Sequence, residues 1–264
     1  MPESQWADRD YLRGVQYKTD ANLAARQSIY AYQEPKIDLP AAILDIVRLS
    51  PRDVIADVGC GNGAYLGELA RRGFGGPGAG ENGHVVGIDM SPGMLAAARV
   101  RDSGATALVN ADATALPLRS ASADVTLAMH MLYHVPEPLD AVRELRRITR
   151  PGGRVVVALN GSDHLREFRV AISAAAGTNC GSDRIRLDDG ETLLRSVFGS
   201  VTRHDFEARL HAPPAAVAAY LSSGYGLQEA ADPGSLLAGI MSRLFHHDAG
   251  PCSVTTHSGI LVCA

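Results

Sequence analysis

The feature that most constrains the fold is an alternation of short apolar runs and amphipathic stretches between residues 53 and 160. The apolar runs predict strands at 53–59, 84–90, 107–112, 123–130 and 154–160. The amphipathic stretches predict helices at 64–73, 91–100 and 138–149. Strands that are apolar on both faces and alternate with helices are typical of a mainly parallel sheet covered on both sides. We therefore expect an α/β fold.

The pattern changes on both sides of this region. Before it, we expect helices at 20–32 and 38–49. After it, we expect helices at 162–176 and 188–198, another helix from 213, and strands at 200–210 and 253–263. This makes seven strands. One α/β domain with additional helices accounts for a chain of 264 residues.

The composition argues against several functions. A net charge of −4 and a pI of about 6.1 give no overall basic surface for nucleic acid. No stretch approaches a membrane-spanning length of apolar residues, and the first ten residues lack a signal-peptide pattern. No CxxC pair occurs among the four cysteines, Cys60, Cys180, Cys252 and Cys263. We therefore expect reduced thiols, a cytoplasmic location, and neither a membrane nor a nucleic-acid partner.

A group of polar residues near the C-terminus has the composition of a metal site but not its spacing. His246, His247 and Asp248 stand close to Cys252 and His257. Adjacent histidine side chains usually point apart, and no carboxylate cluster accompanies them. We therefore expect no metal.

A glycine-rich segment, DVGCGNG at 57–63, follows the first predicted strand. Gly59, Gly61 and Ala64 fit the pattern of a dinucleotide-binding turn, which by itself is a weak signal. In such a turn the backbone approaches a ligand closely, and the following helix presents its positive end. Asp57 suits a cationic ligand end better than a pyrophosphate.

Two more acidic residues end the next two strands. Asp89 could accept hydrogen bonds from ribose hydroxyls, a feature that NAD-binding proteins share. Asp112 could accept a hydrogen bond from an adenine amino group.

The order and spacing of five segments resemble the class I S-adenosylmethionine-dependent methyltransferases of the small-molecule type. These segments, between about residues 50 and 160, are DVGCGNG, GIDMSPGML, NADATALP, SADVTLAMHMLYHV and LRRITRPGGRVVV. The resemblance implies a Rossmann-like, seven-stranded mixed sheet in the order 3-2-1-4-5-7-6, with the last strand antiparallel. It also implies S-adenosylmethionine as the cofactor.

The resemblance further assigns cofactor contacts to residues of these segments. The methionine part would be held by the glycine turn, with Asp57, Gly59, Cys60, Gly61 and Gly63. The adenosine would be held by Asp89 at the ribose, Met90 on the adenine face, and Asp112 with Ala113 at the adenine edge. Met129 would lie near the sulfonium. Met90 and Met129 are also compatible with a purely structural place in the core.

Methyl transfer is a direct displacement that needs alignment and the exclusion of water more than acid catalysis. A base helps when the acceptor is a hydroxyl or a protonated amine. The candidate bases are His130 and His134, just after the strand at 123–130, and a structural role is the alternative for each. Asp163, His164 and Arg166 follow the strand at 154–160, as substrate contacts or helix-cap residues.

Segments outside the sheet are expected to close the site. We expect an N-terminal helical lid at residues 1–50, a core at 51–264, and lid insertions at about 162–198 and 211–247. Because the family commonly has an N-terminal lid, Tyr17 and Arg26 are candidate cofactor-binding residues. Tyr30 could likewise reach the cofactor or the substrate.

The reaction expected is methyl transfer to oxygen or nitrogen of a small molecule, with carbon as a third option and natural-product biosynthesis as one setting. The alternatives are an NAD-dependent dehydrogenase and a cofactor-binding protein without catalysis. Both lysines, Lys18 and Lys36, precede the first predicted strand, which disfavours a Tyr-x-x-x-Lys dehydrogenase site. The chain would act as a monomer or a homodimer.

Overall fold

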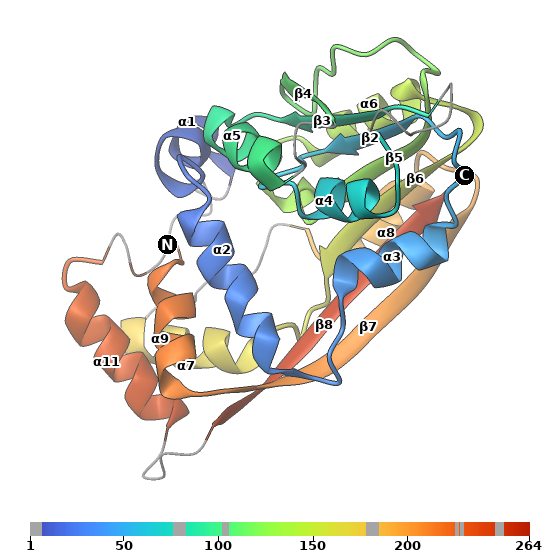
Figure 1. The fold of residues 1–264 in the computed structure, drawn as a ribbon. Helices are drawn as coiled ribbons and strands as arrows, with labels where there is room; N and C mark the ends of the chain where they lie inside the picture. The colour runs from blue at the N-terminus through green and yellow to red at the C-terminus, as the bar shows by residue number, and fades with distance from the viewer. Residues whose placement is uncertain are drawn as a thin grey trace.

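The computed structural model describes residues 7–75, 83–101, 106–177, 185–224, 227, 230–245 and 251–264. Its centre is an eight-stranded sheet in the order β1-β7-β8-β6-β5-β2-β3-β4 (Figure 1). The strands are β1 (Gln33–Glu34), β2 (Ile55–Val58), β3 (Val85–Asp89), β4 (Ala107–Asn110), β5 (Ala123–Met129), β6 (Thr149–Asn160), β7 (Val201–Ala212) and β8 (Cys252–Cys263).

The strand pairing confirms the predicted topology. Five neighbouring strands of the sheet, β4, β3, β2, β5 and β6, run parallel to one another. The strand β8 is antiparallel to both β6 and β7. Leaving out β1, the order is the predicted 3-2-1-4-5-7-6. The count of seven strands was one too low, because β1 pairs Gln33 with Leu210 at the outer edge of β7.

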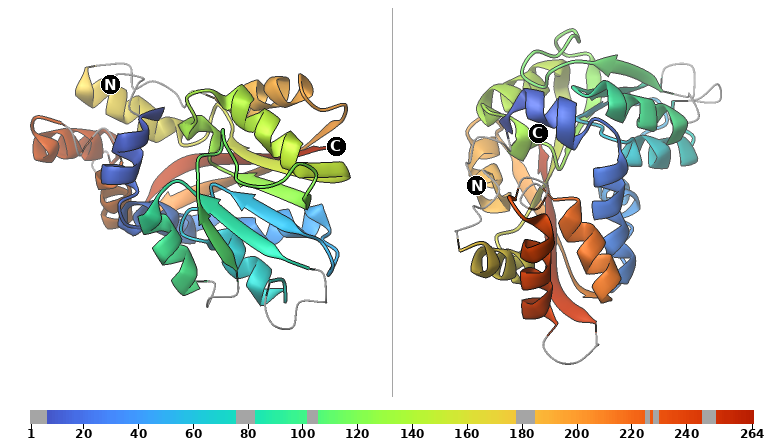
Figure 2. Two further views of the ribbon diagram at one scale, coloured as in Figure 1. Left: turned by 90° about the horizontal axis from the view of Figure 1, so that it is seen from above. Right: turned by 90° about the vertical axis from the view of Figure 1, so that its left-hand side faces the viewer.

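Helices cover both faces of the sheet. The helices are α1 (Arg9–Tyr11), η2 (Leu12–Gln16), α2 (Ala21–Ser28), η3 (Ile29–Tyr32), α3 (Leu39–Val47), α4 (Ala64–Arg71), α5 (Pro92–Arg101), η4 (Leu132–His134), α6 (Pro138–Ile148), α7 (Arg166–Ala176), α8 (Leu187–Arg195), α9 (Pro214–Ser222) and α11 (Pro233–Leu244). Seen from above, α3, α4 and α5 lie on one face and α6 and α8 on the other (Figure 2).

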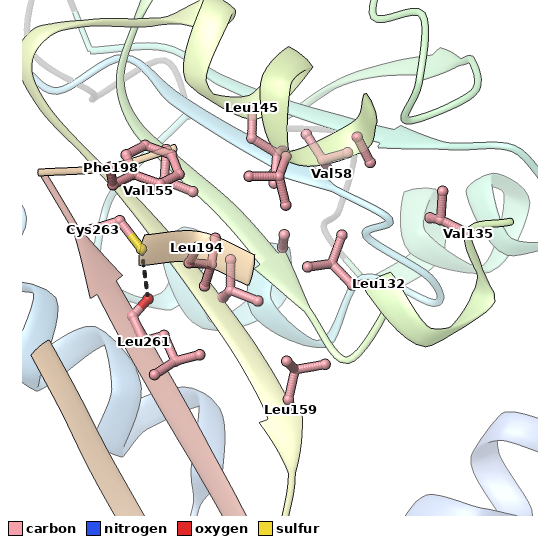
Figure 3. Packing of buried hydrophobic residues seen from close by; sticks show 14 of the residues in the cluster. Val58, Leu132, Val135, Leu145, Val155, Leu159, Leu194, Phe198, Leu261 and Cys263 are labelled. Atoms are coloured by element: carbon pink, nitrogen blue, oxygen red, sulfur yellow. Dashed lines mark hydrogen bonds between the residues drawn. The ribbon is translucent and has the colours of Figure 1, made fainter. Parts of the chain in front are cut away.

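The helix α6 shows why its face of the sheet is well packed. Pro138 occupies the first turn, where its missing N–H costs nothing. Ala141, Val142, Leu145 and Ile148 then follow at helical spacing, and each is fully buried against the sheet. Side chains of α6, α8 and the central strands form one continuous apolar cluster (Figure 3).

The strands β7 and β8 form a long antiparallel pair that reaches past the rest of the sheet (Figure 1). The helices α7, α9 and α11 pack together around its far half, and we call these three helices the cap. The cap helices share an apolar core with η3 and the far half of β7 and β8; it includes Ile29, Phe168, Val217 and Ile240. The helix α2 lies between the cap and the half of the sheet that contains β2 to β4 (Figure 1).

The structure differs from the sequence-based expectations at several points. The predicted helix at 20–32 becomes 3₁₀ from Ile29, and α1, η2 and α11 were not predicted. The helices α3 and α8, which the sequence analysis assigned to lid segments, pack directly on the sheet. Parts of both expected lid insertions, as well as Cys180 and residues 246–248, lie outside the described residues.

Candidate active site

The glycine turn after β2 is built from positions that only glycine can occupy without strain. Gly59, Gly61 and Gly63 have φ angles of +71°, +54° and +77°. A Cβ at Gly59 would lie 2.6 Å from the Cβ of Met131, and one at Gly63 would lie 2.9 Å from the Cα of Ala98. The chain therefore folds sharply at the carboxyl edge of the sheet and enters α4 there.

Asp57, at the end of β2, is fully buried beneath this turn. Among the described residues, neither of its carboxylate oxygens has a hydrogen-bond partner. Burial, together with the negative charge of Asp89, raises the pKa of Asp57 to about 7. A buried carboxyl group without a partner is costly and is a common sign of a ligand site.

Asp89, at the end of the neighbouring strand β3, differs from Asp57 in that its carboxylate has hydrogen-bond partners. Its two carboxylate oxygens accept hydrogen bonds from the backbone N–H groups of Gly61 and Ser91, at 2.9 and 2.8 Å. Burial raises the pKa of Asp89, and these two hydrogen bonds oppose the rise. Asp89 therefore ties the glycine turn to the start of α5.

Asp112 lies at the same edge, after β4. It contacts the N-terminal segment, by which we mean the part of the chain from α1 to η3. One carboxylate oxygen accepts hydrogen bonds from the N–H and hydroxyl of Thr114, at 2.8 and 2.7 Å. The other oxygen lies 2.9 Å from Nε of Arg9 in α1. The sequence offered no signal for Arg9 because the two residues are far apart in the chain.

The predicted contact residues with apolar side chains lie around this edge. Met90 and Ala113 are half-buried, whereas Cys60 and Met129 are buried in an apolar cluster with side chains of α3 and α4. Met131 covers Gly59 and was not predicted as a site residue. Its signal was its place in the segment MHMLYH, directly after the strand.

The structure brings Tyr17, Arg26 and His134 together. The hydroxyl of Tyr17 lies 2.9 Å from Nε2 of His134 and accepts a hydrogen bond from Arg26 at 3.2 Å. Arg26 also donates to the carbonyl of Ser223, at the end of α9, at 3.0 Å. His134 thus anchors the N-terminal segment, and Arg26 connects this segment to the cap.

The same segment lies directly over the glycine turn. Tyr17 accepts a hydrogen bond at its carbonyl from the Ser91 hydroxyl, at 2.7 Å. The Asn62 side chain in the turn donates to the Gln27 side chain of α2 at 3.0 Å. A Cβ at Gly93 would lie 2.0 Å from the carbonyl oxygen of Lys18, so this approach requires glycine.

His130 directly follows β5 in a left-handed conformation, with φ of +55°. Its side chain is half-buried, and burial lowers the pKa of its imidazole to about 4. We find no side-chain hydrogen bond from His130 to any described residue. A non-glycine residue with strained backbone geometry at the edge of a sheet often has a functional role.

His164 follows β6 and is held on both ring nitrogens. Its Nδ1 accepts the backbone N–H of His257 at 3.1 Å, and its Nε2 lies 3.1 Å from the Tyr30 hydroxyl. Burial, with a smaller effect from His130, lowers the pKa of His164 to about 3. The imidazole is therefore neutral, and the proton on Nε2 is donated to Tyr30.

His257 connects β8 to the loop after β6. Its Nδ1 lies 2.7 Å from an Asp163 oxygen and its Nε2 lies 2.7 Å from an Asp205 oxygen. Burial alone would lower the pKa of His257, but the two carboxylates raise it above its usual value. Arg169 and Arg186 both donate to the carbonyl of Ser162, so this loop is held firmly.

Two of the five residues considered for a metal site, Cys252 and His257, lie within the described residues. His257 pairs with two carboxylates, and Cys252 is buried in the apolar core of the cap. Among the described residues, no three His, Cys, Asp or Glu side chains converge as metal ligands.

No helix in the described ranges is sufficiently long and apolar to cross a membrane.

Comparison with known proteins places this geometry in a family. Residues 56–157, which span the strands from β2 to β6, match the model of a methyltransferase domain. The malonyl-[acyl-carrier protein] O-methyltransferase of Laribacter hongkongensis is 28% identical over 211 residues, which are 76% of this chain and 67% of that protein. Residues 56–157 therefore form a methyltransferase domain, which supports the resemblance to the class I S-adenosylmethionine-dependent methyltransferases.

Solved structures of methyltransferase-like proteins share the fold at low identity. A Bacillus halodurans protein superposes with a TM-score of 0.62 and 15% identity, over 86% of this chain and 98% of that one. Phosphoethanolamine N-methyltransferase 2 of Haemonchus contortus, solved with S-adenosylhomocysteine, has a TM-score of 0.58 and 19% identity, over 97% of this chain and 59% of that one. Several of the curated relatives match over only 16–38% of their own length.

The residues around the glycine turn are compatible with S-adenosylmethionine in their charge and position. S-adenosylmethionine has a cationic methionine end and a ribose with two hydroxyls. The buried oxygens of Asp57, without partners among the described residues, suit the cationic end. Asp89 stands at the end of the adjacent strand, where a ligand lying over the turn would meet it.

Proposed function

We propose that this methyltransferase transfers a methyl group from S-adenosylmethionine to an oxygen or nitrogen atom of a small molecule. The observation that carries the proposal is the carboxyl pair at the glycine turn. Asp57 is buried and lacks a partner among the described residues, and Asp89 is held by two backbone N–H groups beside it. A dinucleotide's pyrophosphate would be repelled by Asp57, whereas a cationic ligand end would be attracted.

The positions of these side chains support the following placement of the cofactor. The methionine part would lie on the turn, near Asp57, Gly59, Cys60, Gly61 and Gly63. The adenosine would extend past Asp89 toward Met90, Asp112 and Ala113, under the N-terminal segment that carries Tyr17 and Arg26. Met129 would contribute to the apolar floor of the site. We propose that this segment and the cap serve as the lid.

When bound, the cofactor supplies an electrophilic methyl group on a sulfonium. The chain's residues must align the acceptor and exclude water. The helix α2 of the N-terminal segment covers the turn and would exclude water from it. On either side of α2, the segment is held by the hydrogen bonds of Tyr17 with His134 and of Tyr30 with His164. Alignment of this kind contributes on the order of 7–11 kcal/mol to the barrier reduction.

His130 is the better placed of the two candidate bases. The imidazole of His134 already contacts Tyr17, whereas His130 has no side-chain hydrogen bond to a described residue. Its lowered pKa keeps His130 neutral at pH 7, so that its ring can accept the acceptor's proton. We therefore propose His130 as the base and His134 as a residue that holds the lid.

The acceptor class is supported by one relative. The Laribacter hongkongensis protein is named for methylation of an oxygen on malonyl-[acyl-carrier protein]. This favours oxygen over nitrogen for the present chain. Cys252 and Cys263 are free thiols, which supports the proposal of a cytoplasmic setting. We propose a monomer or a homodimer without a nucleic-acid partner.

The test is the shift in melting temperature with S-adenosylmethionine, S-adenosylhomocysteine and NAD, measured separately. A ligand at about 100 times its dissociation constant adds about 2.7 kcal/mol of stability, which raises the melting temperature by several degrees. We expect a shift with both adenosyl ligands and none with NAD. A shift with NAD alone would overturn the proposal.

Catalysis is tested next with methyl-labelled cofactor and a panel of phenols, carboxylic acids and amines. Transfer of label to a panel member supports the function. Binding of cofactor without transfer to any acceptor class would favour a cofactor-binding protein without catalysis.

A further inference from the structure

The two carboxyl groups under the glycine turn have different partners. Asp89 accepts two backbone hydrogen bonds, from Gly61 and Ser91, and these stabilise its ionised form. Asp57 is fully buried, and neither of its oxygens accepts a hydrogen bond from a described residue. If one of the two groups is protonated, the hydrogen-bond pattern places the proton on Asp57.

The other surroundings of Asp57 do not stabilise a negative charge. On β3 its neighbour is Gly87, and on β5 its neighbour is Leu127. The phenol of Tyr65, on α4, is kept neutral because burial and the charges of Asp57 and Asp38 raise its pKa above the usual range. Of the charged groups in the described residues, Asp89 alone shifts the pKa of Asp57, and burial and Asp89 together raise it to about 7.

We propose that Asp57 holds a proton in the cofactor-free protein and releases it to solvent when the ammonium group at the methionine end of the cofactor binds beside it. The inference rests on the proposed placement of the cofactor. The O–H bond of Asp57 breaks, the proton passes to the buffer, and the carboxylate that remains faces the ligand's ammonium group. No bond in the ligand changes.

Proton release makes cofactor affinity depend on pH. With half of the molecules protonated at pH 7, binding releases about 0.5 proton there and about 0.9 proton at pH 6. Because the protonated form must first lose its proton, the dissociation constant of S-adenosylhomocysteine should fall about tenfold between pH 6 and pH 8.

Calorimetry with two ligands tests the proposal directly. The protein is titrated at pH 6, 7 and 8 with S-adenosylhomocysteine, in two buffers that differ in ionisation enthalpy, so that the difference in heat counts protons. The second ligand is 5′-methylthioadenosine, which has the adenosine and sulfur but no ammonium group. We expect release with S-adenosylhomocysteine and none with 5′-methylthioadenosine.

Two matched variants identify the source of the proton. Asp57→Asn should abolish proton release and the pH dependence of the affinity. Asp112→Asn makes the same chemical change at an acid of this site that is hydrogen-bonded and half-exposed, so it should weaken binding while proton release persists. Release that persists in Asp57→Asn would overturn the proposal.

A second measurement covers a variant that binds too weakly for calorimetry. Without ligand, the raised pKa of Asp57 means that the contribution of Asp57 to stability falls as pH rises from about 4 to about 7. Urea unfolding should show that Asp57→Asn removes this fall, and an unchanged slope would overturn the proposal. Wild-type binding without proton release refutes this inference alone, whereas no binding of either ligand refutes the proposed function as well.

Discussion

The backbone N–H of His257 donates a hydrogen bond to Nδ1 of His164, at 3.1 Å. This single contact decides which nitrogen of His164 carries the proton. Since Nδ1 is an acceptor, the neutral ring has its hydrogen on Nε2 and donates it to Tyr30. The side chain of His257 meanwhile pairs with Asp163 and Asp205, so one residue on β8 positions both the loop and the histidine in it.

His164 should remain neutral, with its hydrogen on Nε2, from pH 5 to pH 8. Burial and the nearby charges lower the pKa of its imidazole to about 3, so protonation begins only under acidic conditions. Nitrogen-15 NMR of histidine-labelled protein measures this, with His164→Gln used to assign the signal. Titration of His164 near pH 6.5, or a hydrogen on Nδ1, would contradict donation from His257 to His164.

His257 should stabilise the fold below neutral pH more than above it. Its pKa is raised in the folded protein, so its contribution is fully present below its unfolded pKa near 6.5 and is lost as pH rises through the higher, folded pKa. His257→Gln should cost about 1.5–3 kcal/mol of unfolding free energy near pH 6 and less near pH 9, in urea unfolding. A cost that increases with pH would show that His257 is not protonated between its two carboxylates.

His130 and His134 should differ in the kinetic parameter they affect. As a base, His130 is expected to contribute roughly 10²–10⁴ to kcat, so His130→Ala should lower kcat without changing the dissociation constant of S-adenosylhomocysteine. His134→Ala removes the contact with Tyr17 and should weaken cofactor binding instead. Equal losses of kcat and of cofactor affinity in both variants would remove the distinction between them.

The pH profile of the wild type provides a second check on His130. The pKa of His130 is lowered to about 4 by burial. Protonation of His130 should therefore leave kcat/KM for the acceptor unchanged from pH 8 down to about pH 5. Below about pH 5 it should lower kcat/KM. The prediction would be wrong if the wild type lost activity as pH fell through about 6.5 and His130→Gln did not. The imidazole of His130 would then be an ordinary, solvated one.

Gly63 should tolerate alanine much less than Gly152 does, although both have positive φ angles of similar size. At Gly63 a Cβ would lie 2.9 Å from the Cα of Ala98, whereas no atom lies within 4 Å of a Cβ at Gly152. Gly152→Ala should cost about 1 kcal/mol from backbone strain alone. Gly63→Ala should cost more and weaken S-adenosylhomocysteine binding. Urea unfolding and calorimetry measure both, and equal costs would mean that α5 moves away without penalty.

Local pattern was sufficient for the central strands and for the helices that cover them. The strands β2 and β5 are apolar on both faces, and α6 has one continuous apolar face, so burial is visible in the residues themselves. The pattern failed for α11, in which Gly234 and Gly239 weaken the helical signal and contacts with α7 and α9 supply the stability. It also failed for β1, which is two residues long and exists through its pairing with β7.

The candidate site divides in the same way. Local sequence pattern predicted the parallel strands and the helices between them, the glycine turn and the acids at the ends of β2, β3 and β4, because these features are local and residue type alone gives their chemistry. Only the tertiary structure separated His130 from His134, which stand four positions apart in one loop. Tyr17 contacts one of them from 117 residues away in the chain. Contacts over such distances are set by how the N-terminal segment packs across the sheet edge, which no local pattern of residues encodes.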